Sequence, residues 1–526
     1  MLVLEESGNN GMHYFVGGGI ASLAAAVFLV RDVQVPGRDI KIFEQLERVG
    51  GSLDGSGGLV NGYLVRGGRM FEEHFVCTAD LLGSIPTPDD RKQSLWDDIL
   101  AFNRTLPGSS KCRLVRAGKK ADVSLGLGAR DILKLNRMLL QSERGLQGQA
   151  IASCFSRDFF DTNFWIMWST MFSFQPWHSA VEMRRYLKRF VHLFPGFSRI
   201  EGILRTRYNQ YDSIITPIVD WLSARGVRIE TGARVSDIEI KQTGAARRVS
   251  QLIMERVDPV SVQTKDRVYL TLGSMTDAST RGSNTMPPPL PEVEGGAWSL
   301  WRKLAERSAD FGNPNAFCAD PIRTTWMSFT ATMQSPEFRD WMEKFTGNVT
   351  GTGGLVTIAD SNWLLSLVMF HQPHFRNQAK GAYVFWGYGL RGDRPGDYVR
   401  KPMWDCSGDE VLSELAWQLD LIDSVRNALG KATIVTCRMP YITSQFMPRR
   451  AADRPPVRPE GAENFALLGQ YCEMPRDTVF TVEYSVRSAM TAVHSMTGKG
   501  RPAPPVVRTD RNPAALLRAA RTLLGA

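Results

Sequence analysis

The sequence lacks the features that mark membrane-spanning, metal-binding and nucleic-acid-binding proteins. It contains no uninterrupted run of about eighteen apolar residues, the length that a membrane-spanning helix requires. Its seven cysteines are scattered without metal-ligand spacing, which indicates free thiols in a reducing compartment and no metal site. It has no block rich in lysine and arginine and no recognisable nucleic-acid module. We therefore predict a cytoplasmic globular protein with no metal and no nucleic-acid partner.

The composition shows an excess of positive charge and enough apolar residues for more than one core. With 63 basic and 54 acidic residues, the net charge is +9. Because the basic residues are dispersed, they favour an acidic small molecule or a peripheral contact with an anionic membrane surface. The chain has 526 residues, 43% of them hydrophobic. That length predicts about two to four domains.

A glycine-rich turn between an apolar strand and a helix is the most informative motif. Residues 14–26 read YFVGGGIASLAAA, and the next predicted strand, residues 40–44, ends at Glu44. In such a unit the glycines let the backbone approach a pyrophosphate, and the helix N-terminus offers free N–H groups to it. The acid accepts a hydrogen bond from an adenosine ribose. The unit therefore predicts a dinucleotide site, although Ser22 stands where a third glycine is usual.

A second glycine turn, Gly50-Gly51 followed by Ser52, lies just beyond Glu44. FAD enzymes of this type extend their phosphate contacts into such a turn, so the pair favours FAD over a nicotinamide dinucleotide. The alternative is a buried strand–helix–strand unit that binds no ligand.

Strands far apart in the sequence are expected to join this unit. Residues 227–240, 268–274 and 464–470 read as strands, and the last two end in glycine turns. The predicted fold is α/β, a Rossmann-like FAD-binding domain assembled from residues 10–80, 220–285 and 455–500. The remaining predicted regions are a helical, aromatic-rich substrate-pocket region (81–219), a substrate-binding domain with a mixed sheet (286–454) and a basic amphipathic tail (501–526).

Two segments have two interpretations each. Residues 155–197 are dense in aromatic residues, which form either an ordinary core or an apolar slot for a long ligand. Residues 512–524 begin with an N-cap asparagine and a proline and carry an apolar stripe at helical spacing. That helix either docks on the protein or lies on a membrane surface.

Eight segments in order along the chain carry a resemblance to one family. They are 50–55 (GGSLDG), 66–69 (RGGR), 177–186 (WHSAVEMRRY), 208–213 (YNQYDS), 360–363 (DSNW), 372–375 (QPHF), 440–444 (PYITS) and 476–481 (RDTVFT). On these segments the chain resembles the oleate hydratases, formerly called myosin-cross-reactive antigens. Members add water across the mid-chain cis double bond of unsaturated fatty acids. They bind FAD without net redox change, and the sequence leaves open whether the flavin must be reduced.

The resemblance implies roles for individual residues. Tyr186 corresponds to the tyrosine that protonates the alkene, and a phenol in an apolar pocket is suited to donate that proton. Gln210 and His374 correspond to positions that hold the fatty-acid carboxylate, and Trp177 is included among the substrate-binding residues. The motifs and the resemblance together predict the following FAD contacts: Gly17, Gly19, Ala21, Ser22, Glu44, Gln45, Gly51, Ser52, Arg69, Val235, Gly273, Ser274, Gly469, Asp477 and Thr481.

The chain departs from the family pattern at the catalytic base and at the carboxylate site. The family places a water-activating glutamate directly after its Arg-Gly-Gly-Arg turn, where this chain has Met70. A thioether cannot take a proton, so Glu72, Glu73, or the flavin and backbone carbonyl groups become the candidates for orienting the water. The other alternative is a slower reaction. Two carboxylate-binding positions before His374 are apolar here, Val368 and Phe370.

The sequence leaves more than one possibility for the oligomeric state and for the function. Because the family's terminal extension is largely missing, the resemblance predicts a monomer or weak homodimer. A flavin-dependent oxidoreductase of the amine oxidase or desaturase type, acting on a lipophilic substrate, is the alternative to a hydratase. A further alternative is a catalytically weak lipid-binding flavoprotein, because Met70 replaces the family's water-activating glutamate.

Overall fold

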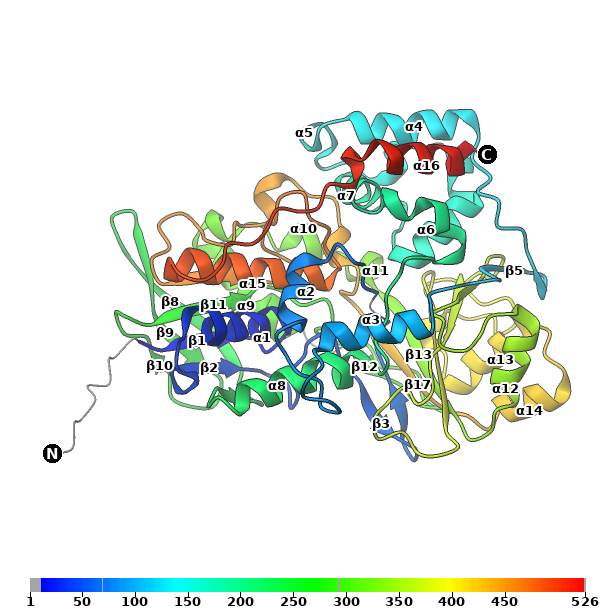
Figure 1. Ribbon diagram of the computed structural model, residues 1–526, viewed down its shortest axis with the longest axis horizontal. Coiled ribbons are helices and arrows are strands. Elements are labelled where there is room, and N and C mark those ends of the chain that lie inside the picture. Colours follow the sequence, from blue (N-terminus) through cyan, green and yellow to red (C-terminus); the bar gives the residue numbers. More distant parts are fainter. Residues whose placement is uncertain (1–10, 69, 292–293, 525–526) are drawn as a thin grey trace.

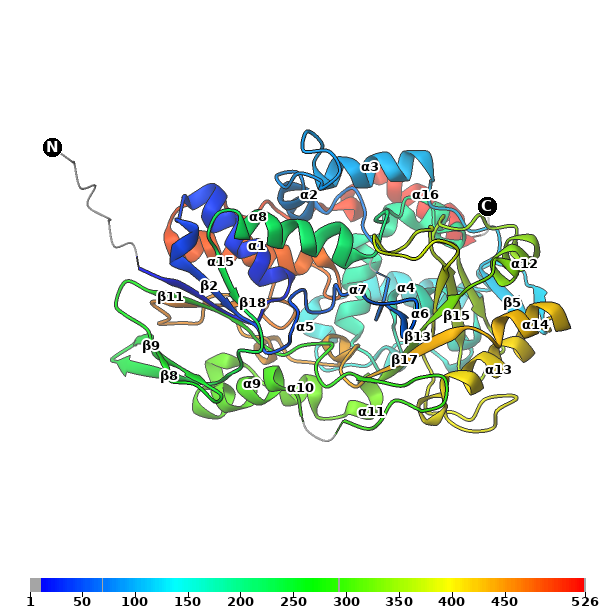
Figure 2. The same cartoon turned by 90° about the horizontal axis from the view of Figure 1, so that it is seen from below.

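A five-stranded parallel sheet organises one half of the molecule (Figures 1 and 2). The computed structural model describes residues 11–68, 70–291 and 294–524. The strand order is β18 (Phe465–Leu468), β11 (Arg267–Thr271), β1 (His13–Val16), β2 (Ile40–Phe43) and β7 (Arg228–Glu230). The central strands β1, β11 and β18 consist largely of buried apolar residues, as expected for a parallel sheet covered on both faces.

Helices cover one face of this sheet and a small second sheet lies beyond the other (Figure 2). Helix α1 (Ile20–Phe28) packs against α15 (Val482–Thr497) and α8 (Thr216–Ser223), and α15 also contacts α2 (Val76–Leu82). All residues of α1 are buried, and its run of alanines lets its neighbours approach closely. On the opposite side lie the antiparallel strands β8 (Val235–Thr243), β9 (Ala246–Met254) and β10 (Val260–Ser261), with α9 (Gly296–Arg307) against β8.

An eight-stranded mixed sheet organises the other half. Its order is β12 (Thr280–Arg281), β17 (Thr433–Met439), β13 (Trp326–Met333), β16 (Tyr383–Gly389), β15 (Leu365–Met369), β14 (Leu355–Ile358), β5 (Leu114–Arg116) and β6 (Lys119–Lys120). Only β14 and β5 pair in parallel among the described strands of this sheet. Beside it lie the hairpin β3 (Ser56–Gly58) and β4 (Gly62–Leu64), and the helices α12 (Glu337–Thr346), α13 (Gly408–Gln418) and α14 (Asp423–Leu429).

A helical region forms the upper right of Figure 1. It comprises α4 (Ala129–Leu140), α5 (Glu143–Leu146), α6 (Asn163–Phe172), α7 (Ala180–Arg189) and the 3₁₀ helix Val191–Arg199. The C-terminal helix α16 (Pro513–Leu524) packs against that 3₁₀ helix. The remaining helices are α3 (Leu95–Thr105), α10 (Asn315–Cys318) and α11 (Pro321–Thr324). No described helix combines the length and the apolar composition needed to cross a bilayer.

The predicted fold class is confirmed, and the aromatic segment contributes both to the core and to the wall of a cavity. The parallel sheet draws its strands from three separated stretches of sequence. However, β5 and β6 lie within the segment predicted to be helical, yet they complete the eight-stranded sheet, because β5 pairs with the distant β14. In the aromatic segment, Phe164 and Trp168 stack in the core, whereas Phe172 stands beside Tyr186 and Phe190 and lines a cavity.

Candidate active site

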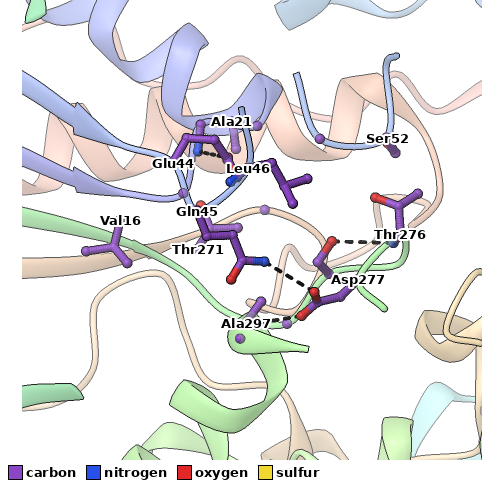
Figure 3. Close-up of a pocket in the computed structure, with 18 of the residues that line it drawn as sticks. Val16, Ala21, Glu44, Gln45, Leu46, Ser52, Thr271, Thr276, Asp277 and Ala297 are labelled. Carbon is purple, nitrogen blue, oxygen red and sulfur yellow. Dashed lines mark hydrogen bonds between the residues drawn. The ribbon is translucent and has the colours of Figure 1, made fainter. Parts of the chain in front are cut away.

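A long cleft lies at the carboxyl ends of β1, β2 and β11, lined by both glycine turns (Figure 3). Gly17 has φ +95°, a conformation that favours glycine. A Cβ added to Gly19 would have no atom within 4 Å, so this residue faces open space. Gly19 also begins α1, and no side chain caps the N-terminal N–H groups of that helix. The cleft therefore presents an uncapped helix N-terminus, which attracts an anion.

Acidic groups at the cleft are held by backbone amides. The Glu44 carboxylate accepts hydrogen bonds from the backbone N–H groups of Gly18 at 2.8 Å and Leu46 at 2.9 Å. Asp277 accepts one from the amide of Gln45 at 3.2 Å and one from the Ala297 backbone at 2.9 Å (Figure 3). Burial raises the pKa of both carboxyl groups. These acids are placed to accept hydrogen bonds from hydroxyl groups of a ligand.

Most of the predicted cofactor residues meet at this cleft. Those that line it are Gly17, Gly19, Ala21, Glu44, Gln45, Gly51, Ser52, Val235, Gly273, Ser274 and Gly469. Arg69 lies outside the described residues. Ser22 does not line the cleft, because it is buried with its hydroxyl 3.3 Å from that of Thr271.

Two further predicted cofactor residues serve other contacts. Asp477 is buried in an ion pair with Arg487 at 2.7 Å. Thr481 caps α15 by accepting a hydrogen bond from the Tyr484 backbone. Asp277 was not among the predicted cofactor residues. Its position directly after a predicted strand and a glycine turn is a signal that could have identified it.

A second cavity, here called the tyrosine cavity, surrounds Tyr186. Its lining is Gly68, Met70, Phe71, Glu72, Phe75, Met171, Phe172, Tyr186, Phe190, Ile203, Phe480, Thr481 and Val482. Tyr186 lies on α7, is buried, and donates a hydrogen bond from its hydroxyl to the carbonyl oxygen of Val479 at 2.6 Å. The surroundings are mainly apolar, so this phenol stands where bulk water is largely excluded.

Glu72 lines the tyrosine cavity, but its carboxylate is held by several basic groups. It lies 2.8 Å from the His74 ring, 3.3 Å from Arg189 and 3.5 Å from His192. Burial opposes ionisation, but these partners outweigh it and lower the pKa of Glu72 to about 2. Glu72 is therefore ionised and weakly basic at neutral pH. Glu73, in contrast, is exposed and does not line the cavity, so the structure does not bring this candidate base to the site.

Glu72, His74 and His192 also form a group with metal-ligand chemistry. Their ligand atoms lie within 4.8 Å of one another. Arg189 already balances the carboxylate charge, however, and hydrogen bonding from His74 occupies one of its oxygens. The group therefore has a sufficient explanation as an ion-pair network.

A third cavity, here called the head-group cavity, adjoins the tyrosine cavity, and the two share Gly68, Met70, Met171 and Phe480. Its other lining residues are Thr170, Ser173, Arg205, Thr206, Gln210, Trp326, Gly351, Gly353, Leu355, Val368, Met369, Phe370, His371, His374, Trp386 and Tyr388. The two cavities therefore adjoin each other at these four shared residues.

Gln210 and His374, the two residues predicted to hold a carboxylate, both line the head-group cavity. The backbone and the side-chain amide of Asn209 both donate to the carbonyl oxygen of His374, at 2.8 and 3.1 Å. Burial lowers the pKa of His374 to about 3, so its ring is neutral. Trp177 lies elsewhere: it lines neither cavity, and its ring N–H donates to the carbonyl of Arg323.

Gln470 connects the glycine-lined cleft to the two apolar cavities. Its amide donates to the carbonyl oxygen of Thr481 at 2.9 Å, and its side-chain oxygen accepts from the backbone of Phe480 at 2.6 Å. Gln470 lines the cleft, while Phe480 lines both cavities. These hydrogen bonds therefore link the wall of the cleft to the wall of both cavities.

Comparison with known proteins agrees with this arrangement. A family model described as the MCRA family matches residues 10–494. The chain belongs to the MCRA family. It is 40% identical over 501 residues to an oleate hydratase of Streptococcus pyogenes serotype M49 (strain NZ131), covering 92% of this chain and 84% of that protein. It is 30% identical to a linoleate hydratase of Lactiplantibacillus plantarum, covering 97% of each. The predicted resemblance is confirmed.

A solved structure also shows the shared fold. The wild-type putrescine oxidase bound to putrescine has a TM-score of 0.52 and 12% sequence identity, covering 93% of this chain and 99% of that chain. This likeness extends the fold assignment to nearly the whole MCRA chain and carries no statement about its reaction.

Proposed function

We propose that the protein hydrates the cis double bond of unsaturated fatty acids such as oleate, giving a hydroxy fatty acid. The observation that carries this proposal is the pair of adjoining, mainly apolar cavities, one lined by the buried Tyr186 and the other by Gln210 and His374. A fatty acid has the matching chemistry, with a polar head, a long apolar chain and an alkene within it. The names of the two hydratase relatives support the same substrate class.

FAD is the proposed cofactor of the glycine-lined cleft. Gly19 leaves a space that any Cβ would fill, and Glu44 offers a buried acceptor for a ribose hydroxyl. When bound, FAD would supply a scaffold and an electrostatic element for the reaction, and we propose that the reduced form serves best.

Tyr186 is the proposed proton donor. Its phenolic proton is transferred to one alkene carbon, and the oxygen of a water molecule bonds to the other carbon. That water then loses one proton, which restores the phenol, so the product is the substrate plus one water. The hydrogen bond to Val479 orients the hydroxyl before transfer.

Glu72 is the proposed water-positioning group. It lines the cavity, and its Oε1 accepts no hydrogen bond within the described residues. Because its pKa is low, its contribution is to accept a hydrogen bond from water rather than to remove a proton completely. Met70 contributes apolar surface at the junction of the two cavities.

Product analysis tests this function against the oxidoreductase alternative. Purified protein supplied with FAD is incubated with oleate, and products, oxygen uptake and hydrogen peroxide are measured. A hydratase gives a hydroxy acid and consumes no oxygen. A flavin oxidase or desaturase gives a product that has lost hydrogen, with oxygen consumed or flavin reduced, and that result would replace the proposal.

A peripheral contact with an anionic membrane is proposed for α16. This helix buries Ala515 and Ala519 but exposes Leu516, Leu517 and Arg518. Exposed leucines beside arginine suit the interface of an anionic bilayer. Flotation with vesicles of phosphatidylglycerol, compared with phosphatidylcholine, tests this contact. The cytoplasmic location and the monomeric or weakly dimeric state stay predictions.

A further inference from the structure

Arg205 is a cation at the head-group cavity that has no acidic partner within the described residues. Its two terminal nitrogens donate to the backbone carbonyl oxygens of Thr352 and Leu106. Its Nε is buried and has no hydrogen-bond acceptor in the part of the chain that the structure describes. Burial lowers the pKa of Arg205 to about 10, so the group stays charged at neutral pH. The next arginine along the chain, Arg207, differs because it pairs with Asp98 at 3.3 Å.

The turn at residues 351–353 is shaped around Arg205 and His371. A Cβ added to Gly353 would stand 2.5 Å from the Cδ of Arg205, and one added to Gly351 would stand 2.9 Å from the Cα of His371. Both glycines also have positive φ, +72° and +88°. Glycine at these positions therefore leaves room for the two side chains at the cavity.

Neutral hydrogen-bonding groups surround the charge of Arg205. His371 and His374 each have a buried Nδ1 without a hydrogen-bond partner among the described residues, and both line the cavity with Arg205. Arg205 and His371 both pack against the ring of Phe102, at 5.6 and 5.2 Å. Burial lowers the pKa of His371, and the nearby charges of Arg207 and Arg205 lower it further. The cavity thus holds one fixed positive charge among polar groups that are neutral.

The same cavity lacks polar groups where the family resemblance places them. Val368 and Phe370 line it, and the Phe370 ring stacks on His374 at 3.7 Å. These apolar side chains cannot donate a hydrogen bond to a carboxylate. A buried charge without a counter-ion is costly, and an anionic ligand relieves that cost.

We propose that Arg205 binds the carboxylate of the substrate and selects free fatty acids over uncharged lipids of the same chain length. This inference rests on the proposed function, which identifies the ligand as a fatty acid. It adds the residue that supplies the positive charge. A guanidinium suits a carboxylate because it donates two parallel hydrogen bonds. His371 and Gln210 complete the subsite from the other sides of the cavity.

The test compares Arg205→Gln with Arg207→Gln, a matched control whose side chain pairs with Asp98 and does not line the cavity. Oleate binding is measured by titration calorimetry. The KM and kcat are measured from the rate of oleate hydration. For Arg205→Gln we expect the Kd and KM for oleate to rise about ten- to one-hundredfold, as for loss of a charged hydrogen bond, with kcat changed by less than about threefold. Binding of oleyl alcohol is expected to stay unchanged, and Arg207→Gln is expected to behave as the wild type.

An unchanged affinity of Arg205→Gln for oleate would overturn the inference. If Arg205→Gln does not fold, as judged by thermal unfolding, Arg205→Lys takes its place and is expected to weaken oleate binding less but measurably. Equal affinity of Arg205→Lys and wild type would then overturn it. If the wild type binds oleate through Arg205 but forms no hydroxy acid, the proposed function fails while the head-group assignment stands.

Discussion

The hydroxyl of Tyr186 and the carbonyl oxygen of Val479 lie 2.6 Å apart, and this hydrogen bond joins α7 to the segment that precedes α15. The segment continues into Phe480 and Thr481, which the side chain of Gln470 ties to the glycine-lined cleft. The proposed proton donor is therefore positioned by the same stretch of chain that links the cleft to the apolar cavities.

Replacement of Tyr186 by phenylalanine should abolish most hydration and preserve the fold. The ring still packs against Phe172 and Phe190, but the transferable proton is gone. Loss of a general acid typically costs on the order of 10²–10⁴ in rate. The hydration rate is compared with FAD content and melting temperature. A variant with more than half of the wild-type rate would remove Tyr186 from the mechanism.

Two changes in the cleft should yield protein with little bound flavin. Gly19→Val places a side chain in space that is open in the structure, so it occludes the ligand without a clash inside the protein. Glu44→Ala removes the proposed ribose acceptor. Gly58→Val is the control, since a Cβ there also meets no atom within 4 Å but lies in the β3 strand outside the cleft. Flavin absorbance after purification gives the occupancy, and full occupancy in both cleft variants would mean that the cofactor site is misplaced.

Replacement of Met70 by glutamate should not accelerate hydration. Phe71 and Leu204 exchange backbone hydrogen bonds in an antiparallel bridge, so position 70 stands opposite Arg205. A carboxylate there would pair with Arg205 or stay protonated in apolar surroundings. We expect Met70→Glu to raise the KM for oleate, with no more than a modest change in kcat.

The glutamate variants separate the two candidate bases. Glu72→Gln should slow hydration, because the acceptor for water is weakened, whereas the exposed Glu73→Gln should match the wild type. The hydration rates of Glu72→Gln, Glu73→Gln and Met70→Glu are measured side by side. Full activity of Glu72→Gln together with a more than tenfold gain in Met70→Glu would show that no native carboxylate assists the water.

The buried pair of Glu182 with Arg454 and Arg449 predicts a pH-dependent stability. Burial opposes ionisation of Glu182, but Arg454, Arg449 and Arg185 outweigh it and lower its pKa to about 2. A carboxyl group with a lowered pKa stabilises the fold above its unfolded pKa of about 4.3, and loses this effect as pH falls towards 2. Glu182→Gln should cost about 3–5 kcal/mol at pH 7 because the buried Arg454 loses its ion pair, whereas Arg449 still pairs with Glu473. Denaturant unfolding at several pH values should show the difference from wild type shrinking below about pH 4.5. A difference that stays constant down to pH 3 would contradict this account.

Much of the cofactor cleft could be predicted because its signals are local. The turn from Gly17 to Gly19, the acid at the end of β2 and the second turn at Gly51 each lie within a short stretch of sequence, where backbone geometry restricts the residue type. The α/β class followed from the same unit. Ser22 and Asp477 were assigned to the cleft from motif position alone, and the structure places both in buried contacts within the protein.

The environment of the proposed catalytic groups could not be predicted from local pattern. Glu72 appears in the sequence as a free candidate base, but its pKa depends on Arg189 and His192, more than a hundred residues away. Arg205 carries no motif, and its meaning depends on the absence of an acidic partner in the described fold and on the glycines at 351 and 353. Such properties arise only when distant segments meet.

The fate of the water oxygen is the most direct test of whether the protein hydrates oleate through Tyr186. The protein, supplied with FAD under anaerobic conditions, is incubated with oleate in water enriched in heavy oxygen, beside the Tyr186→Phe variant. The proposed hydration yields a hydroxy acid that carries one heavy oxygen on a chain carbon, formed by the wild type and almost absent with the variant. A product without the label, or a dehydrogenated fatty acid in place of a hydroxy acid, would contradict it.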